Sequence, residues 1–441
     1  MVRLLRVLGA SVVFFTLGLA PGAFAGGTEL DLVAAVRARL EMIESHRSYR
    51  HWSAVDEREA LAQAVNAPLG PLHGTVVAVK DNIDLLWLPT SAGARALVNR
   101  RPTANATVVD RLLAAGAVIP GHTNMDTWAR GVRTVSQTVG ATANARNPKY
   151  GPMGSSGGSA VAVALGDADA ALGTDTCGSL RYPAAANLIL GLRPTPGLVS
   201  RAGVVPLSPT QDVVGPMARD VATLAAVLDV IAGPDPRDPL TSTAPKRERT
   251  YTQDLAVDRN SAPWRVGVVR SLGAYRHDAS GDTMLNRLVR AEIVVVDVRL
   301  PSLLEASVID EESSATRPMV LSGSGEQRWL SEPLPVTNAV EYRTRRIHRM
   351  ENAARLIDVM DRFDLDALAY PTTPFLPSLR GAPQPSANCH VSATSGLPAL
   401  ALPLGLDERR VPVPGIDLLG RPFDEERLLQ LALIITGAPA P

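Results

Sequence analysis

Residues 151–183 read GPMGSSGGSAVAVALGDADAALGTDTCGSLRYP, and two Gly/Ser-rich turns in this stretch flank an Ala/Val-rich segment. The first turn, residues 154–159, leads into the run AVAVALG, which predicts a buried helix whose first amide groups are unpaired. The second turn, residues 174–179, follows the apolar run AALG. Glycine in such a turn lets backbone N–H groups approach a reacting atom closely. A serine hydroxyl in these turns is therefore a candidate nucleophile.

A Gly/Ser turn alone also suits a phosphate cradle or a tight packing turn, although the sequence has no Walker-type motif. What sharpens the interpretation is Lys80, which ends the run VVAVK. With Ser155 and Ser179, it resembles the triad of the amidase signature family, serine hydrolases of amide bonds. The match is close at AVKDNID (78–84), GSSGGSA (154–160) and GTDTCGSLRYPAA (173–185).

The resemblance spans roughly residues 30–235 and 365–435, and it implies a single α/β/α layered domain with a large mixed central sheet. Alternating patterns agree, with helices expected over 29–66 and 107–115. Strands are expected over 72–80, 117–120, 266–269 and 293–298. The amidase domain would cover 26–441, with a signature core at about 70–220 and a variable, substrate-shaping region at about 235–385. The segment SRAGVVPLSPTQD (200–212) is most similar to the peptide-amidase-like branch of the family.

The resemblance assigns a role to each of the three polar residues. Ser179 is the nucleophile, and Ser155 is a bridging serine, held by a cis peptide bond, that relays the proton to Lys80. Lysine is a base only when neutral, and an apolar strand end lowers its pKa by desolvation. Only three of the 44 Lys and Arg residues are lysines, so a lysine here suggests a need for a group that can lose its proton, which arginine cannot. The alternative is a lysine facing water.

The second turn also supplies the expected oxyanion donors, the backbone N–H groups of Thr176, Cys177, Gly178 and Ser179. Cys177 replaces a glycine that is common at this position in the family, and we expect it to have a negative φ and to preserve activity. An alternative makes Cys177 the nucleophile, with His390 approaching in space as its base.

Supporting roles are expected for residues around the two turns. Asp175 and Arg181 are expected to brace the second turn as an ion pair, and Ser156 to support the first. Asn124 and Gln211 are interpreted as structural hydrogen-bonding residues near the site. The sequence shows no metal-ligand spacing, so neither a metal nor another cofactor is expected.

The first residues predict export. Arg3 and Arg6 precede an apolar run, residues 8–19, and the small-residue end Ala23-Phe24-Ala25 follows. This is a signal-peptide pattern with cleavage after Ala25, placing the mature protein in the periplasm or outside the cell without a stable membrane anchor. The alternative, a membrane anchor, needs a longer apolar run of roughly 20 residues.

Composition narrows the partners. Lys plus Arg and Asp plus Glu both number 44, so no nucleic-acid partner is expected, and the oligomeric state stays open. Cys177 and Cys389 are the two cysteines of the sequence, which are too few for a disulfide scaffold. A bridge between them is possible, but it would constrain the second turn.

The sequence therefore predicts an exported amidase that hydrolyses a carboxylic amide, of a peptide or a small acyl or aryl compound, to acid plus ammonia or amine. Two alternatives remain. One is a binding protein that keeps the fold without catalysis. The other is the amide-transferring subunit of a tRNA-dependent amidotransferase, which shares these motifs.

Overall fold

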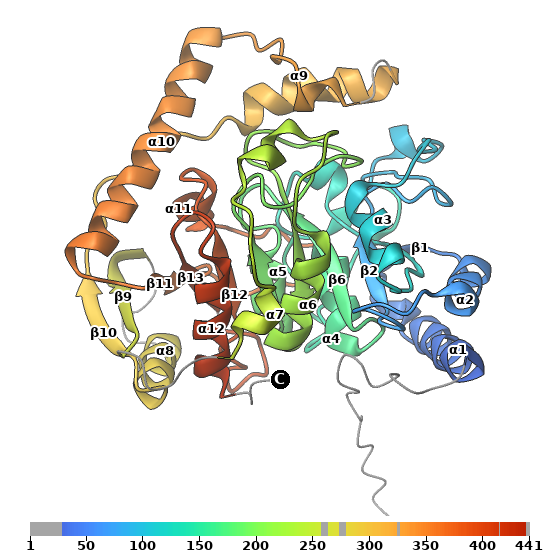
Figure 1. Cartoon of the computed structure of the whole chain (residues 1–441), viewed down its shortest axis with the longest axis horizontal. Coiled ribbons are helices and arrows are strands. Elements are labelled where there is room, and N and C mark those ends of the chain that lie inside the picture. The colour runs from blue at the N-terminus through green and yellow to red at the C-terminus, as the bar shows by residue number, and fades with distance from the viewer. Residues whose placement is uncertain (1–28, 257–262, 273–278, 324–326, 414, 438–441) are drawn as a thin grey trace, which may run out of the picture.

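The computed structural model describes all residues except 1–28, 257–262, 273–278, 324–326, 414 and 438–441 (Figure 1). The strands are β1 (Trp52–Val55), β2 (Val77–Lys80), β3 (Gly121–Thr123), β4 (Val135–Ser136), β5 (Gly140–Ala141), β6 (Ala170–Asp175), β7 (Leu190–Arg193), β8 (Val213–Ala218), β9 (Arg265–Val269), β10 (Val294–Val298), β11 (Ala367–Pro371), β12 (Ala399–Leu402) and β13 (Ile416–Leu419). The helices are α1 (Glu29–Ser45), α2 (Glu57–Asn66), α3 (Thr107–Ala114), α4 (Gly157–Leu165), α5 (Arg181–Asn187), α6 (Val221–Ile231), α7 (Tyr251–Asp254), α8 (Ala279–Arg290), α9 (Ile309–Ser322), α10 (Ala339–Arg362), α11 (Cys389–Ala393) and α12 (Glu425–Thr436).

One sheet of 11 strands connects most of these elements, in the order β1-β3-β2-β6-β8-β7-β12-β13-β11-β9-β10. The neighbours β3-β2-β6 and β11-β9-β10 run parallel, whereas the pairs between β6 and β11, and the pair β1-β3, run antiparallel. The sheet is therefore mixed, which confirms the predicted α/β class with a large mixed central sheet.

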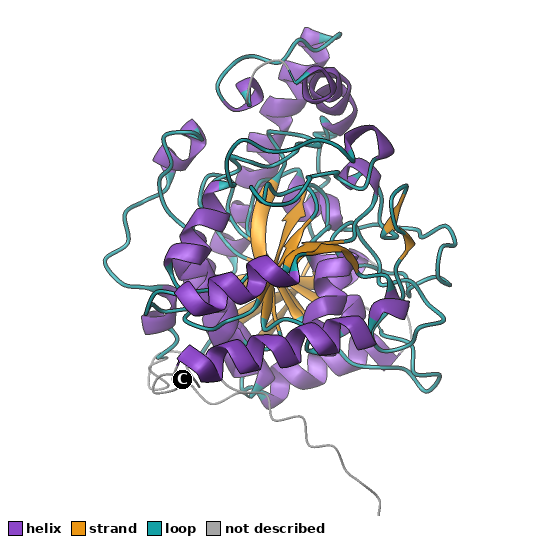
Figure 2. Cartoon of the chain, turned by 90° about the vertical axis from the view of Figure 1, so that its right-hand side faces the viewer, coloured by secondary structure: helices purple, strands orange, loops and turns teal. Residues whose placement is uncertain are grey.

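Helices cover both faces of the sheet, as Figure 2 shows. Along β2 the side chains alternate: Val77 and Val79 join the largest apolar cluster, which also includes α6 and α12, and Ala78 joins the cluster of α4 and α5. This alternation is the two-residue period of a strand buried on both sides. The α/β/α layering follows from it.

The N-terminal expectations are correct only in part. The segment 29–66 forms α1 and α2, but β1 interrupts them and pairs with β3, which an expectation of continuous helix missed. So short an edge strand carries too few residues to show a two-residue period. The strand expected at 72–80 begins only at Val77, and the one expected at 117–120 begins only at Gly121, after Pro120, which has no N–H to donate. Val118 makes a single bridge to Val76.

The region expected to shape the substrate pocket is part of the same sheet. Its strands β9, β10 and β11 form one edge, and the expected strands at 266–269 and 293–298 are confirmed within one residue. Leu356 and Met360 of α10 pack against this edge in an apolar cluster. The rest of α10 and all of α9 extend beyond the layered body (Figure 1).

The predicted signal peptide, residues 1–25, lies outside the described residues. Of the helices that the structure describes, none combines the length and apolar character that crossing a membrane requires. The described part of the chain begins with α1, whose Leu32, Val36 and Leu40 pack into an apolar cluster with α2.

Candidate active site

The first Gly/Ser turn, residues 154–159, runs into α4, which begins at Gly157. Its Gly154–Ser155 peptide bond is cis, as the family resemblance implies. A Cβ at Gly154 would lie 2.3 Å from Asp126 Oδ2, so only glycine fits there. That Asp126 carboxylate accepts the backbone N–H groups of Arg133 at 2.8 Å and Thr134 at 2.7 Å. The turn is thus seated against a buried carboxylate.

Lys80 meets this turn from the end of β2, where its side chain is fully buried. Its Nζ donates to Ser155 Oγ at 2.8 Å and to Thr174 Oγ1 at 2.7 Å, with a further contact to the Thr174 carbonyl at 3.3 Å. The parallel pairing of β2 with β6 brings Thr174 alongside Lys80. The ammonium group therefore has three defined acceptors, one of which is the predicted bridging serine.

Burial gives Lys80 the pKa of a base. Desolvation lowers the pKa of Lys80 from 10.5 to about 7, against the attraction of the carboxylates of Asp126, Asp212 and Asp175, which raise it. Because the pKa lies near 7, a substantial share of Lys80 is neutral at neutral pH. A lysine facing water, the alternative drawn from the sequence, is excluded by its burial.

Ser179 follows β6 and is 5% exposed. Its carbonyl accepts the N–H of Ser156 at 3.2 Å, which ties the two turns together. Ser156 also donates its hydroxyl to the Thr174 carbonyl at 3.1 Å, and so supports both turns. Among the described residues, no hydrogen bond joins the hydroxyls of Ser155 and Ser179. The structure thus joins Lys80 to Ser155 directly, and Ser179 to this pair through the main chain.

The second turn is held by Asp175, the last residue of β6. Its carboxylate accepts the N–H of Gly178 at 2.7 Å and that of Leu180 at 3.2 Å. Gly178 has a φ of 88°, and a Cβ there would lie 2.6 Å from the Tyr182 ring, so glycine is required. The Gly178 amide, one of four expected oxyanion donors, already has an acceptor. The remaining three are Thr176, Cys177 and Ser179.

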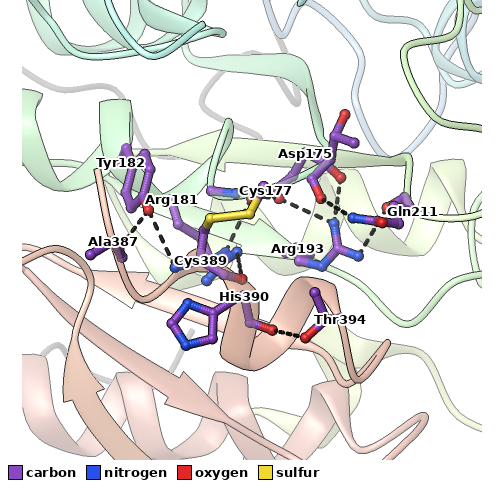
Figure 3. The surroundings of a disulfide bond; sticks show 12 residues. Asp175, Cys177, Arg181, Tyr182, Arg193, Gln211, Ala387, Cys389, His390 and Thr394 are labelled. Carbon is purple, nitrogen blue, oxygen red and sulfur yellow. Dashed lines mark hydrogen bonds and ion pairs between the residues drawn. A yellow bond between two sulfur atoms is a disulfide. The ribbon is translucent and has the colours of Figure 1, made fainter. Parts of the chain in front are cut away.

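Four fully buried charges surround the turn, and Figure 3 shows three of them, Asp175, Arg181 and Arg193. Arg181 Nε lies 3.1 Å from Asp175, which is the ion pair that the sequence predicts, and Arg193 lies 3.1 Å from the same carboxylate. Arg181 also pairs with Asp417 of β13. Although burial raises the pKa of Asp175, Arg181 and Arg193 hold it well below its ordinary value. Two cations thus balance two anions, and the network braces the turn.

Cys177 forms a disulfide with Cys389, the first residue of α11 (Figure 3). A disulfide sulfur has no thiolate, so Cys177 is not the nucleophile in this structure, and the alternative with His390 as its base is wrong here. Cys177 does not have a positive φ, as expected. The bridge ties the turn to the C-terminal part of the chain.

Several site residues were missed at the level of sequence. Thr174 accepts from Lys80 and also from Asn82 Nδ2, at 3.1 Å, and both lie in segments that match the family. Asp212 accepts the Thr176 hydroxyl at 2.5 Å. Because a threonine or an asparagine has many structural uses, only the tertiary structure shows that Thr174 contacts the lysine and that Asn82 contacts Thr174.

The two expected structural residues hold loops around the site. Asn124 donates to Thr142 Oγ1 at 2.9 Å. Gln211 accepts the N–H of Val308 at 2.8 Å and donates to the Thr176 carbonyl at 3.4 Å. Within the described ranges, no group of three or more His, Cys, Asp or Glu side chains is arranged to hold a metal ion.

Comparison with known proteins places the chain in a family. The family model described as Amidase matches residues 34–319. The chain is 36% identical to a glutamyl-tRNA(Gln) amidotransferase subunit from Chloroflexus aurantiacus, over 94% of this chain and 95% of that protein. The protein belongs to the amidase family.

Solved structures agree. The native peptide amidase of Stenotrophomonas maltophilia is 31% identical and superposes with a TM-score of 0.80, covering 95% of this chain and 98% of that one. The corresponding glutamyl-tRNA(Gln) amidotransferase subunit from Thermotoga maritima is 26% identical, with a TM-score of 0.74 and coverages of 93% and 92%. The chain is therefore an enzyme acting on carbon–nitrogen amide bonds, as a hydrolase or an amidotransferase.

Proposed function

We propose that this protein is an exported amidase, which hydrolyses a peptide amide or a small acyl or aryl amide to acid plus ammonia or amine. The observation that carries the proposal is the 2.8 Å hydrogen bond between Lys80 Nζ and Ser155 Oγ, inside a site where burial lowers the lysine pKa to about 7. This pair provides a base at neutral pH and a hydroxyl that can pass a proton to it.

In the proposed reaction, Ser179 Oγ attacks the amide carbonyl and its proton passes through Ser155 to neutral Lys80. The carbonyl oxygen becomes an oxyanion, stabilised by backbone N–H groups of the second turn. Ser155 then gives a proton to the departing nitrogen, Lys80 replaces it, and an acyl-enzyme on Ser179 remains. Water hydrolyses the acyl-enzyme through the same relay, which returns all three residues to their starting state.

A second candidate is the amide-transferring subunit of a tRNA-dependent complex. The relatives named as amidotransferase subunits favour it, since 36% identity extends over 94% of the chain. The higher TM-score of the peptide amidase, 0.80 against 0.74, favours the free-standing amidase. The triad chemistry is the same in both, so only substrate and partner separate them.

Export has a second support besides the N-terminal pattern. The Cys177–Cys389 disulfide joins residues 212 positions apart, and disulfides persist in oxidising compartments such as the periplasm and the cell exterior. A tRNA-dependent reaction takes place in the cytosol, where thiols stay reduced. The disulfide therefore favours the exported amidase over the amidotransferase subunit.

The test measures ammonia or amine release by the full chain from peptide C-terminal amides, aryl amides, short acyl amides and L-glutamine, alongside Ser179→Ala. We expect release from at least one non-glutamine amide and its loss in the variant. Ser45→Ala, at an exposed serine, is the matched control and should keep full activity.

A fluorophosphonate probe separates the remaining outcomes. Labelling of Ser179 without release from any amide other than glutamine would favour the amidotransferase reading. Neither labelling nor release from any amide would favour the binding protein that keeps the fold without catalysis. Location is tested separately, by fractionating cells that express the full chain and sequencing the N-terminus, which should begin at Gly26.

A further inference from the structure

The disulfide connects the two parts of the chain that meet at the proposed oxyanion turn. Cys177 lies in the middle of residues 175–179, and Cys389 begins α11, with a Cα–Cα distance of 4.9 Å. Both cysteines are half-buried, so neither residue is fully shielded from solvent. The bridge is therefore a covalent restraint on the turn that a reductant can remove.

The anchor at Cys389 is itself firmly held. Tyr182, in the helix after the turn, donates its hydroxyl to the Ala387 carbonyl at 2.6 Å and accepts the N–H of Cys389 at 3.3 Å. Arg181 donates to the Cys389 carbonyl at 3.4 Å. These contacts do not depend on the sulfur–sulfur bond, so the anchor stays in place after reduction.

Asn388 fixes the anchor from its other side. It is 3% exposed, and its Nδ2 donates to the carbonyls of Pro371 at 2.9 Å and Leu272 at 2.6 Å. Pro371 is the last residue of β11, so the anchor is attached to the central sheet. A bond from Cys177 to this anchor transmits the rigidity of the sheet to the turn.

The turn has side-chain restraints on either side of Cys177. Asp175 accepts the Gly178 amide, and the Thr176 hydroxyl donates to Asp212. Cys177 has only its bridge as a side-chain restraint among the described contacts. Its own amide is one of the three expected donors left free by Asp175, and the amide of Ser179 is another. The position of these amides thus depends on how Cys177 is held.

We propose that the Cys177–Cys389 disulfide positions the oxyanion turn, so that its reduction lowers turnover while the fold is retained. The proposal rests on the proposed amidase function. Oxyanion donors act only when they are held within about 0.5 Å of the productive hydrogen-bonding position, and loss of one donor lowers kcat by about 10²–10³. Loosening the turn without deleting a donor should cost less, on the order of 10-fold.

The redox step is a thiol–disulfide exchange. A dithiol reductant gives two electrons and two protons to the bridge, which becomes the thiols of Cys177 and Cys389, while the reductant closes to its own disulfide. No other bond changes. Reoxidation removes the same two electrons and two protons, so the effect on turnover should be reversible.

The experiment compares oxidised full chain, chain treated with a dithiol, reoxidised chain, and Cys389→Ser with and without the dithiol. Free thiols are counted in each sample, far-UV circular dichroism and thermal unfolding check the fold, and kcat and KM are measured well below the unfolding midpoint. We expect kcat to fall by about 10-fold on reduction and in Cys389→Ser, with KM nearly unchanged, and to recover on reoxidation. The dithiol should have no effect on Cys389→Ser.

Each remaining outcome overturns the proposal in a distinct way. Two free thiols in the untreated chain would show that no bridge forms. Equal kcat before and after reduction would leave the bridge a role in stability alone, and a change confined to KM would assign it to the substrate pocket. If Cys389→Ser does not fold, the reduced and reoxidised wild type still decide between these results.

Failure of the proposed amidase function can be distinguished from failure of the positioning role of the disulfide. It would leave the oxidised chain without hydrolysis and Ser179 without fluorophosphonate label, and the present proposal would fall with it. If instead the oxidised chain hydrolyses an amide and reduction changes nothing, only the positioning role is wrong. The rate of Ser179 labelling gives a second readout, since it should fall with kcat on reduction.

Discussion

The turns around Lys80 and the segment formed by α9 and α10 (residues 309–322 and 339–362) differ in the side chains that they leave exposed to solvent. Around the turns, charged side chains are buried and each has several partners, as Lys80 and Asp175 show. On α10, apolar side chains are exposed instead: Val340 is 75% exposed and Met350 is 74% exposed. The site residues are thus held by several buried contacts each, whereas α10 exposes apolar side chains to solvent.

The two regions meet through a few buried contacts. Glu312 of α9 accepts the Ser208 hydroxyl at 2.6 Å, the Thr210 N–H at 3.0 Å and the Tyr342 hydroxyl at 2.7 Å. The loop that carries Ser208 also carries Asp212, which holds Thr176 of the second turn. Glu312 therefore attaches α9 to the loop that carries Asp212, beside the site.

The largest effect is expected at the lysine. Lys80→Met keeps a straight apolar side chain but removes the base, and amide hydrolysis should fall by about 10²–10⁴-fold in kcat. Steady-state kinetics measure it, with Lys149→Met, at an exposed lysine, as the matched control. Wild-type activity in Lys80→Met would exclude Lys80 as the base.

The same base sets the pH dependence. Because burial lowers the Lys80 pKa to about 7, kcat/KM should rise with pH up to about 7 and then level off. The folded chain releases the Lys80 proton earlier than the unfolded chain, so stability should rise with pH between about 7 and 10.5. That slope should be weaker in Lys80→Met, as denaturant titrations at several pH values would show.

Next in size is the charge network. Asp175→Asn leaves Arg181 and Arg193 buried without their shared carboxylate, and should lower the free energy of unfolding by about 3–5 kcal/mol. Denaturant unfolding measures the loss. Asp364→Asn, in an exposed ion pair with Arg265, is the matched control and should change stability by less than about 1 kcal/mol. Equal losses in both variants would contradict the bracing role.

A smaller effect is expected where the two regions meet. Glu312→Gln replaces one acceptor oxygen by an NH₂ group that faces donors, which should lower the free energy of unfolding by about 1–3 kcal/mol. Hydrogen exchange should show the greatest loss of protection in α9. Glu351→Gln on α10, whose carboxylate lies 3.9 Å from Arg355, serves as the control. Unchanged protection of α9 would show that Glu312 does not attach the segment.

The smallest effect is expected on the exposed face of α10. Met350→Ser should change the free energy of unfolding by less than about 0.5 kcal/mol, because its side chain already contacts water. Met360→Ser, fully buried on the same helix, should cost about 2–5 kcal/mol. Thermal unfolding of the pair measures the contrast. A large loss from Met350→Ser would show that this face is covered in solution.

The sequence by itself determined the family, the layered α/β class and the residues Lys80, Ser155 and Ser179 as a group. It could do so because each lies in a short segment that matches the family closely: AVKDNID for Lys80, GSSGGSA for Ser155 and GTDTCGSLRYPAA for Ser179. Local composition also placed α3, α4, β9 and β10, with α4 predicted from the Ala/Val-rich run after the first Gly/Ser turn. The short edge strand β1 was missed, because its pairing with β3 is decided by a partner about 70 residues away.

Only the tertiary structure decided which groups surround these three residues. Thr174 and Asp212 enter the site because parallel and antiparallel pairing aligns β2, β6 and β8. The Cys177–Cys389 bridge depends on the approach of α11 to the second turn across 212 positions of sequence. The lysine pKa likewise follows from burial and from three distant carboxylates. Such properties depend on distances in space, which residue spacing along the chain does not encode.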